Sequence, residues 1–256
     1  MSPILFQFGR FHIYAYGFFI AVGIVAAALL AVLKVRKSDI EISFENAADL
    51  LFYTVLSGFL GSRILYVLLH LDVFRRDPLQ IFKLWEGGLV FYGGLIAAAG
   101  VAFGYMKRHR LPVWKLADLI SPLIALGLSS GRIGCFLAGC CYGKETSLPW
   151  AVVFRNPDSL ARLNVPLHPT QLYEAVNGFV LFFFLSWIEK RKSFDGQIFW
   201  LFLFLYSILR FFVEIFRGDP RGFLFTDLLS TSQAMGILLA IFSLFMLSYM
   251  KEKSPR

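Results

Sequence analysis

The chain has 256 residues, of which 57% are hydrophobic and only 16% charged, and 29 of them are phenylalanines. A soluble domain carries about 25% charged residues, so these values argue against a soluble globular protein and favour one embedded in lipid. The formal net charge is +8, which we attribute to loops that face anionic lipid. No basic run is long enough, or interleaved with aromatic residues, to indicate nucleic-acid binding.

The apolar stretches predict an all-α polytopic membrane protein with about seven transmembrane helices, because a helix needs about 20 mostly apolar residues to cross the hydrocarbon. The first 19 residues lack the basic region and cleavage site of a signal peptide, so the first stretch is expected to stay as a helix. We expect a single integral membrane domain over residues 1–256. The predicted spans are 13–33, 46–69, 87–106, 116–137, 170–188, 197–216 and 227–249.

The basic residues of the loops predict the orientation. Thirteen lysines and arginines fall in short loops on one side, and nine fall in longer segments on the other. The positive-inside rule then places the C-terminus in the cytoplasm and the N-terminus outside. Two outward segments, 70–86 and 138–169, are long enough to form a small extracytoplasmic cap, and the run LPWAVVF in the second predicts a short strand.

Three arginines, Arg63, Arg132 and Arg210, fall inside predicted spans. A charge near the bilayer centre costs roughly 2.5–3.5 kcal/mol on insertion scales, so each needs a partner, water or a function. All three lie late in outgoing helices and therefore at a similar depth in the outer half of the membrane. A guanidinium pairs with phosphate through two hydrogen bonds, so the set predicts a site for a phospholipid headgroup. The alternative is that these long side chains extend to the membrane–water interface. This alternative is strongest for Arg63.

Arg210 also belongs to a polar stripe on its predicted helix. Tyr206, Arg210, Glu214 and Arg217 are spaced to share one face, and Glu214 is placed to neutralise Arg210 or Arg217. The alternative is a structural role, in which these residues form hydrogen bonds and ion pairs with one another and hold neighbouring helices together. That alternative does not explain the glycines on both sides of Arg132.

Two glycine-rich segments accompany these charges. Small residues are common where membrane helices touch, but a glycine–arginine motif beside a glycine-pair segment indicates a pocket for a lipid headgroup. The glycines are Gly131, Gly134, Gly139 and Gly143 around Arg132, and Gly87, Gly88, Gly93 and Gly94 at the start of the third predicted span.

Taken together, these motifs resemble the prolipoprotein diacylglyceryl transferase family over nearly the whole chain. The resemblance implies transfer of the diacylglyceryl group of phosphatidylglycerol to the lipobox cysteine of a prolipoprotein signal peptide. The products are a thioether and glycerol 1-phosphate, in the first step of lipoprotein maturation at the bacterial inner membrane, with no cofactor. The matching motifs are Tyr16-Gly17, GSRILYV (61–67), WEGGLVFYGGLIAA (85–98), GRIGCFLAGCCYG (131–143), HPTQLYE (168–174) and YSILRFFVEIFR (206–217).

The resemblance also implies roles for individual residues. Arg132 is expected to bind the headgroup, and Arg210 to be an essential active-site residue. This fits the chemistry, since preorganised arginines in a dry site stabilise a departing glycerophosphate. The expected substrate-binding residues are Arg132, Tyr16, Gly93, Gly94, Gly143, Tyr206, Glu214, Arg217 and Arg63.

The chain departs from the family at the expected proton acceptor. Many members have histidine at the position of Tyr92, and a tyrosine with a pKa near 10 is a weaker base. Tyr92 is therefore a candidate base, a hydrogen-bond donor to the headgroup, or an interfacial aromatic residue. His168 is the fallback base, or else part of a turn with Thr170 as the following N-cap.

A second departure is a group of cysteines, Cys135, Cys140 and Cys141, where many members have asparagine and glutamate at the first two positions. A zinc site lacks a clear fourth ligand, and we predict no metal. Two other roles for the cysteines remain open, a disulfide on the outer face and a covalent intermediate. The favoured interpretation is that the cysteines are small, buried, inert packing residues. Because of these departures, a non-catalytic family member that binds lipid or signal peptides remains an alternative to the enzyme. An anionic-lipid transporter is the other alternative.

Overall fold

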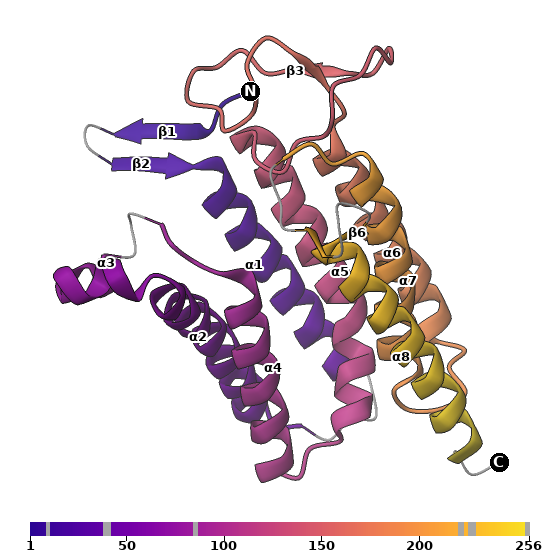
Figure 1. Ribbon diagram of the computed structural model, residues 1–256. Coiled ribbons are helices and arrows are strands. Elements are labelled where there is room, and N and C mark those ends of the chain that lie inside the picture. The colour runs from indigo at the N-terminus through magenta and orange to yellow at the C-terminus, as the bar shows by residue number, and fades with distance from the viewer. Residues whose placement is uncertain (9–10, 38–41, 84–86, 220–222, 225–228, 254–256) are drawn as a thin grey trace. The chain divides into compact units, whose positions relative to one another are not determined.

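The computed structural model describes residues 1–8, 11–37, 42–83, 87–219, 223–224 and 229–253. The predicted all-α polytopic membrane fold is confirmed. Among the described helices, six are long and apolar enough to cross a membrane, and α4 is outside that set. The long helices are α1 (Ala15–Arg36), α2 (Phe44–Leu69), α4 (Phe91–Arg108), α5 (Val113–Ala138), α6 (Thr170–Glu189), α7 (Gln197–Ile215) and α8 (Thr231–Lys253) (Figure 1).

Two predicted spans begin too early. The last, expected from residue 227, has a strand at Leu229–Ser230 and becomes helix only at Thr231. The span expected at 87–106 begins as helix only at Phe91, because Gly87 and Gly88 have φ angles of +84° and +78°, which a right-handed helix does not contain. The fourth predicted span, 116–137, lies within an uninterrupted helix that contains Pro122. Residues 227 and 228 of the last predicted span lie outside the described residues, as do Arg10, Arg221 and Arg256 of the loop charges.

Short elements connect the long helices. The segment 70–86 contains the helix α3 (Leu71–Arg76) and the 3₁₀ helix η1 (Pro78–Phe82). The strand expected in LPWAVVF is confirmed as β3, which pairs with β4 in an antiparallel ladder. The strands are β1 (Ile4–Phe8), β2 (Phe11–Tyr14), β3 (Val152–Val153), β4 (Pro166–Leu167), β5 (Phe223–Leu224) and β6 (Leu229–Ser230).

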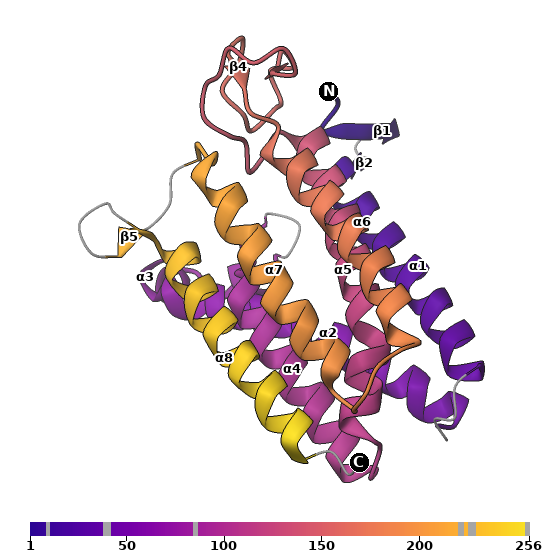
Figure 2. The same cartoon turned by 90° about the vertical axis from the view of Figure 1, so that its right-hand side faces the viewer.

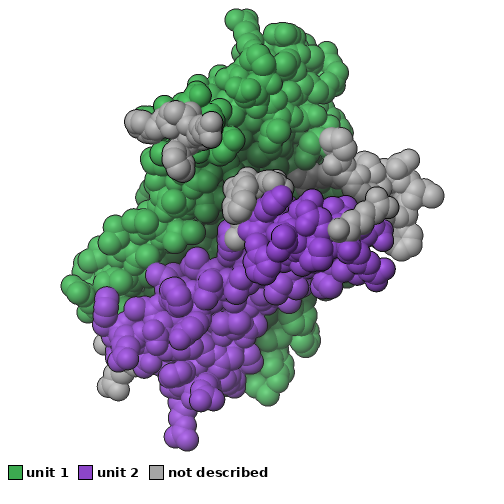
Figure 3. Space-filling view, turned by 90° about the vertical axis from the view of Figure 1, so that its left-hand side faces the viewer, with its two compact units in different colours: residues 1–38, 117–256 green, residues 39–116 purple. Residues whose placement is uncertain are grey.

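The chain divides into two compact units, residues 1–38 with 117–256 and residues 39–116 (Figure 3). In the second unit, α2 and α4 pack through glycines. A Cβ atom on Gly93 would lie 2.4 Å from the carbonyl oxygen of Gly61, and one on Gly94 would lie 2.7 Å from that of Gly58. Gly93 and Gly94 thus allow the two helices to touch, while their expected part in substrate binding stays a prediction.

Arg63 is buried in this same unit and bonds to backbone. Its Nε donates to the carbonyl oxygen of Ile81 at 3.0 Å, Nη2 to that of Gln80 at 2.6 Å, and Nη1 to that of Gly87 at 2.6 Å. Several carbonyls around one guanidinium satisfy a charge that burial would otherwise penalise. The guanidinium therefore connects the segment after α2 to the segment before α4. This contradicts the alternative that the Arg63 side chain extends to the membrane interface.

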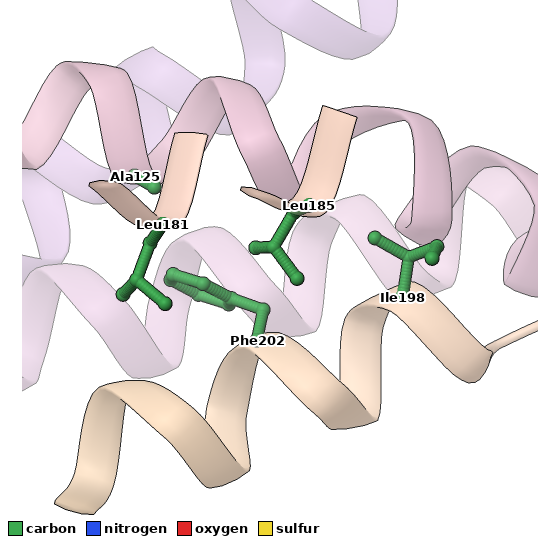
Figure 4. Close-up of a cluster of buried hydrophobic side chains, with 5 residues drawn as sticks. All are labelled: Ala125, Leu181, Leu185, Ile198 and Phe202. Atoms are coloured by element: carbon green, nitrogen blue, oxygen red, sulfur yellow. The ribbon is translucent and has the colours of Figure 1, made fainter. Parts of the chain in front are cut away.

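The first unit has its apolar core between α5, α6 and α7, and α7 and α8 lie side by side (Figures 1 and 2). The core cluster is Ala125, Leu181, Leu185, Ile198 and Phe202 (Figure 4). On the other side of α5, the Ser130 hydroxyl donates to the carbonyl oxygen of Phe19 in α1 at 2.6 Å. These contacts place the late turns of α5 beside the start of α6 and the end of α7.

The glycine contact between α2 and α4 can be tested by a substitution. In Gly93→Val the new side chain meets the α2 backbone, and overpacking of this kind costs about 1–3 kcal/mol. We expect a lower free energy of unfolding in detergent micelles, followed by circular dichroism. The control is Gly100→Val in the same helix, where an added Cβ meets nothing within 4 Å. Equal losses in the two variants would show that the glycine contact does not matter.

Candidate active site

One carboxylate, Glu174 in the first turns of α6, holds three arginines. Its Oε2 lies 2.6 Å from Nε of Arg132 in α5, and its Oε1 lies 3.0 Å from Nη1 of Arg210 in α7 and 3.1 Å from Nη1 of Arg217. Glu174 is only 8% exposed. Glu174 falls in the motif HPTQLYE (168–174), but it was not among the predicted site residues. A lone carboxylate inside a predicted span was the available signal, because such a group requires a cationic partner.

Two further carboxylates complete the charge balance of this cluster. Glu214 lies 2.7 Å from Nη1 of Arg210, which is one of the two partners that the spacing on the helix face predicted for it. The Ser230 hydroxyl donates to Glu214 at 3.1 Å. Arg217 pairs with Asp219 through Nε at 2.8 Å and Nη2 at 2.9 Å, a bidentate contact. Three guanidiniums and three carboxylates thus share a largely buried region.

Gly143 joins the backbones that carry these side chains. Its N–H donates to the carbonyl oxygen of His168 at 3.0 Å, and it forms a β-bridge with Arg217. A Cβ atom at this position would lie 2.4 Å from the Cβ of His168 and 2.8 Å from the carbonyl oxygen of Phe216. Only glycine allows the chain after α5 to pass between the start of α6 and the end of α7.

Two tyrosines accompany Arg132. Tyr206 lies one turn before Arg210 on α7, is half-buried, and interacts with the Arg132 guanidinium. Tyr16 lies in α1, where a Cβ atom added to Gly134 would come within 3.0 Å of the Tyr16 Cα, so the two backbones touch near Arg132. The side chain of Tyr16 is 47% exposed.

The predicted site residues therefore divide between the two units. Arg132, Arg210 and Arg217 are brought together on one carboxylate, and Arg63, which was expected to join them, belongs to the other unit and binds backbone carbonyls there. The remaining members of the first unit are Tyr16, Gly143, His168, Tyr206 and Glu214, and those of the second are Tyr92, Gly93 and Gly94.

His168 is buried just before α6. Its Nδ1 lies 3.2 Å from the Tyr173 hydroxyl, and its ring centroid lies 5.1 Å from that of Phe216. Burial, with the positive charge of Lys144, lowers the pKa of His168 below its ordinary value. The expectation that Thr170 caps α6 is wrong, because the N-cap residue is Pro169 and makes no side-chain cap bond.

The three cysteines gather where α5 ends. Their Sγ atoms all lie within 4.8 Å of one another, and all three thiols are free. Hydrogen bonds from the Cys135 and Cys140 thiols, together with the charges of Arg217 and Arg132, lower the pKa of Cys141. The favoured interpretation as inert packing residues does not account for this grouping of sulfur atoms.

Removing the shared carboxylate should destabilise the protein. In Glu174→Ala three guanidiniums lose their common partner, and breaking a buried ion pair costs about 3–5 kcal/mol. We expect a loss of this size in the free energy of unfolding in micelles. Glu145→Ala is the control, since its ion pair with Arg162 is exposed and 3.9 Å long, and such pairs contribute at most about 1 kcal/mol. A loss in Glu174→Ala no larger than in this control would contradict the central role of Glu174.

His168 should make stability depend on pH. Its pKa is lowered in the folded protein, so the unfolded chain binds the proton more readily than the folded one once the pH falls below the ordinary value of 6.5. The contribution is therefore complete above that value and is lost as the pH falls towards the folded pKa. We expect the free energy of unfolding to fall less steeply in His168→Gln than in wild type between about pH 7 and pH 5. Identical slopes would overturn this reading.

Comparisons with known proteins show the family of the chain. Residues 3–249 match the sequence profile of the family described as prolipoprotein diacylglyceryl transferase. A phosphatidylglycerol–prolipoprotein diacylglyceryl transferase of Clostridium tetani is 38% identical over 245 residues, covering 96% of each chain. The second such enzyme of Clostridium perfringens is 40% identical over all of this chain and 98% of its own, and that of Chromohalobacter salexigens is 37% identical over 94% and 89%. The chain belongs to the prolipoprotein diacylglyceryl transferase family.

Proposed function

We propose that this transferase moves the diacylglyceryl group of phosphatidylglycerol onto the lipobox cysteine of a prolipoprotein signal peptide. A thioether forms and glycerol 1-phosphate is released. The observation that carries the proposal is the group of three arginines around Glu174, because it gathers buried guanidinium donors of the kind that bind a phosphodiester. The names of the relatives supply the substrate classes.

Arg132 is the proposed ligand of the headgroup phosphate. It contacts Glu174 through Nε, which leaves its two terminal NH₂ groups to be shared between Tyr206 and a phosphate. A guanidinium held in place by one carboxylate keeps its orientation while a second anion approaches. The acidic residues balance the three arginines, so the resting site is stable without lipid, and the phosphodiester competes for donors already directed inward.

Arg210 is the proposed stabiliser of the leaving group. The thiolate attacks a glycerol carbon, the bond from that carbon to the phosphate oxygen breaks, and its electron pair departs with glycerol phosphate. Charge grows on this oxygen in the transition state, and fixed positive groups in a dry site lower its energy most. Glu174 and Glu214 both hold Nη1 of Arg210, and thereby limit its movement during the reaction.

Two side chains are proposed as acceptors of the thiol proton. Tyr92 occupies the position at which many family members have histidine, and its side chain is 41% exposed. His168 has a lowered pKa and is therefore neutral at physiological pH, as a base must be. Loss of transfer in His168→Gln with retention in Tyr92→Phe would assign the proton to His168, and the reverse pattern would assign it to Tyr92.

The proposed location is the bacterial inner membrane, with the N-terminus outside, the C-terminus in the cytoplasm and the active site towards the outer face. The distribution of loop lysines and arginines supports this orientation, which puts the chain segments 70–86 and 138–169 on the outer side of the membrane. A fluorescent protein fused to the C-terminus should fold and fluoresce, whereas an alkaline phosphatase fusion there should be inactive.

The two arginines can be tested in a defined reaction. Purified protein is mixed with phosphatidylglycerol in micelles and a lipobox peptide, and the peptide mass is followed. We expect a gain of one diacylglyceryl group, with the rate lowered about 10²–10³-fold in Arg132→Ala and in Arg210→Ala, as for loss of one transition-state donor. Arg155→Ala is the control, because this arginine is exposed on a loop.

The same assay separates the competing functions. No mass gain by a folded wild-type protein would favour a lipid-binding or signal-peptide-binding member. Movement of labelled phosphatidylglycerol between the leaflets of a vesicle, without a mass gain, would favour a transporter. Full activity in both arginine variants would show that the Glu174 cluster is structural.

A further inference from the structure

The proposed transfer reaction assigns no role to Cys135, Cys140 and Cys141. The chain contains three cysteines in all, and the structure places their Sγ atoms within 4.8 Å of one another. They come from two different local structures, since Cys135 lies in the last turn of α5 and the other two follow the end of that helix at Ala138. The chain therefore has to turn back to bring the sulfur atoms together.

Backbone geometry and buried hydrogen bonds hold this turn. Gly139 and Cys141 have φ angles of +79° and +62°, and a left-handed conformation at a non-glycine residue needs support from its surroundings. The Thr170 hydroxyl donates to the carbonyl oxygen of Cys141 at 2.8 Å, and the Gln171 amide nitrogen donates to that of Cys140 at 2.8 Å. Both α6 side chains are fully buried, so the sulfur atoms are positioned by a rigid frame.

This arrangement suits a thiophilic cation. A zinc–sulfur bond of about 2.3 Å in tetrahedral geometry places two sulfur atoms about 3.8 Å apart, so small side-chain rotations would bring the cysteines into range. Three thiolates and one divalent ion carry a net charge of −1. Arg132 and Arg217 interact electrostatically with Cys141 and favour its thiolate form. Buried groups that fix the ligands are what metal sites use to hold geometry.

Among the described residues, the group of possible metal ligands contains these three cysteines and no fourth Cys, His, Asp or Glu, which indicates the type of site. Structural zinc sites have four protein ligands, whereas catalytic sites have three and leave one position open. We propose that Cys135, Cys140 and Cys141 bind one Zn²⁺-class ion, and that the open position binds the thiolate of the substrate cysteine. The inference rests on the proposed function, because it names how the thiol that enters this site is activated.

The step balances without an oxidant or reductant. The substrate S–H bond breaks as sulfur binds the ion, and the proton passes to a base or to water. The metal-bound sulfur then supplies the electron pair that forms the new bond to the glycerol carbon, and the electrons of the broken carbon–oxygen bond leave with glycerol phosphate. A metal ion deprotonates a coordinating thiol outright, so a strong base in the position of Tyr92 is unnecessary.

Metal binding is tested first without substrate. Protein treated with chelator and reductant is titrated with Co²⁺, and the thiolate-to-cobalt absorption is recorded. We expect saturation at one ion per chain and loss of the absorption in the Cys135→Ser, Cys140→Ser, Cys141→Ser triple variant. An absorption that is absent in the wild type, or unchanged in the folded triple variant, would overturn the proposal.

A second measurement needs no variant. Because the three cysteines are the only ones in the chain, the mass gained on alkylation reports this cluster alone. We expect Zn²⁺ to protect all three thiols of the wild-type protein, and Mg²⁺ to protect none. Equal alkylation with and without Zn²⁺ would overturn the site.

The open position is tested with peptide. A lipobox peptide added to the Co²⁺ protein should strengthen the thiolate-to-cobalt absorption, and a peptide with serine at the lipobox position should not. Equal spectra with the two peptides would overturn the binding of substrate sulfur.

The transfer assay then separates this inference from the proposed function. Full transfer by metal-free protein would leave the function standing and overturn the metal's role. One bound Co²⁺ per chain with no transfer, even after Zn²⁺ is restored, would leave the metal site standing and overturn the function.

Discussion

Glu174 contacts three arginines that come from two helices and from the chain just after one of them, and together with Glu214 and Asp219 it balances their charge in a largely buried region. A single carboxylate offers two oxygens and about four acceptor positions, so it orients three guanidiniums while adding only one negative charge. The arginines remain rich in donors that the carboxylate does not use. A phosphodiester that enters this region meets positive groups already held in place, which is the condition under which electrostatic stabilisation is most effective.

Close approach of backbones makes this arrangement possible. Gly143 lets the chain after α5 pass against His168 and Phe216, and Gly134 lets α1 touch α5 beside Arg132. In the other unit, Gly93 and Gly94 bring α4 onto α2 in the same manner. Helices in lipid gain little from the hydrophobic effect when they associate, so tight contact through small residues supplies much of their attraction.

Arg63 shows that an arginine inside a membrane helix need not bind a ligand. Its nitrogens bond to the backbone carbonyls of residues 80, 81 and 87, among others. These carbonyls lie between α2 and α4, where the described residues form only short helices. The same residue type thus pairs with carboxylates in one unit and with backbone carbonyls in the other, and the difference lies in which acceptors the fold provides.

The amino-acid sequence by itself determined the class of fold, the approximate helices, the shared helix face of Arg210 and Glu214, and the family, because hydrophobic length, helical spacing and motif order are all local properties of the chain. Only the tertiary structure decided that Glu174 joins Arg132, Arg210 and Arg217, and that Cys135, Cys140 and Cys141 converge. Glu174 and Arg132 lie on different helices, and no spacing along one helix reports which side chains meet across two. The start of α4 was misplaced for a related reason, since hydropathy does not register the left-handed backbone at Gly87 and Gly88.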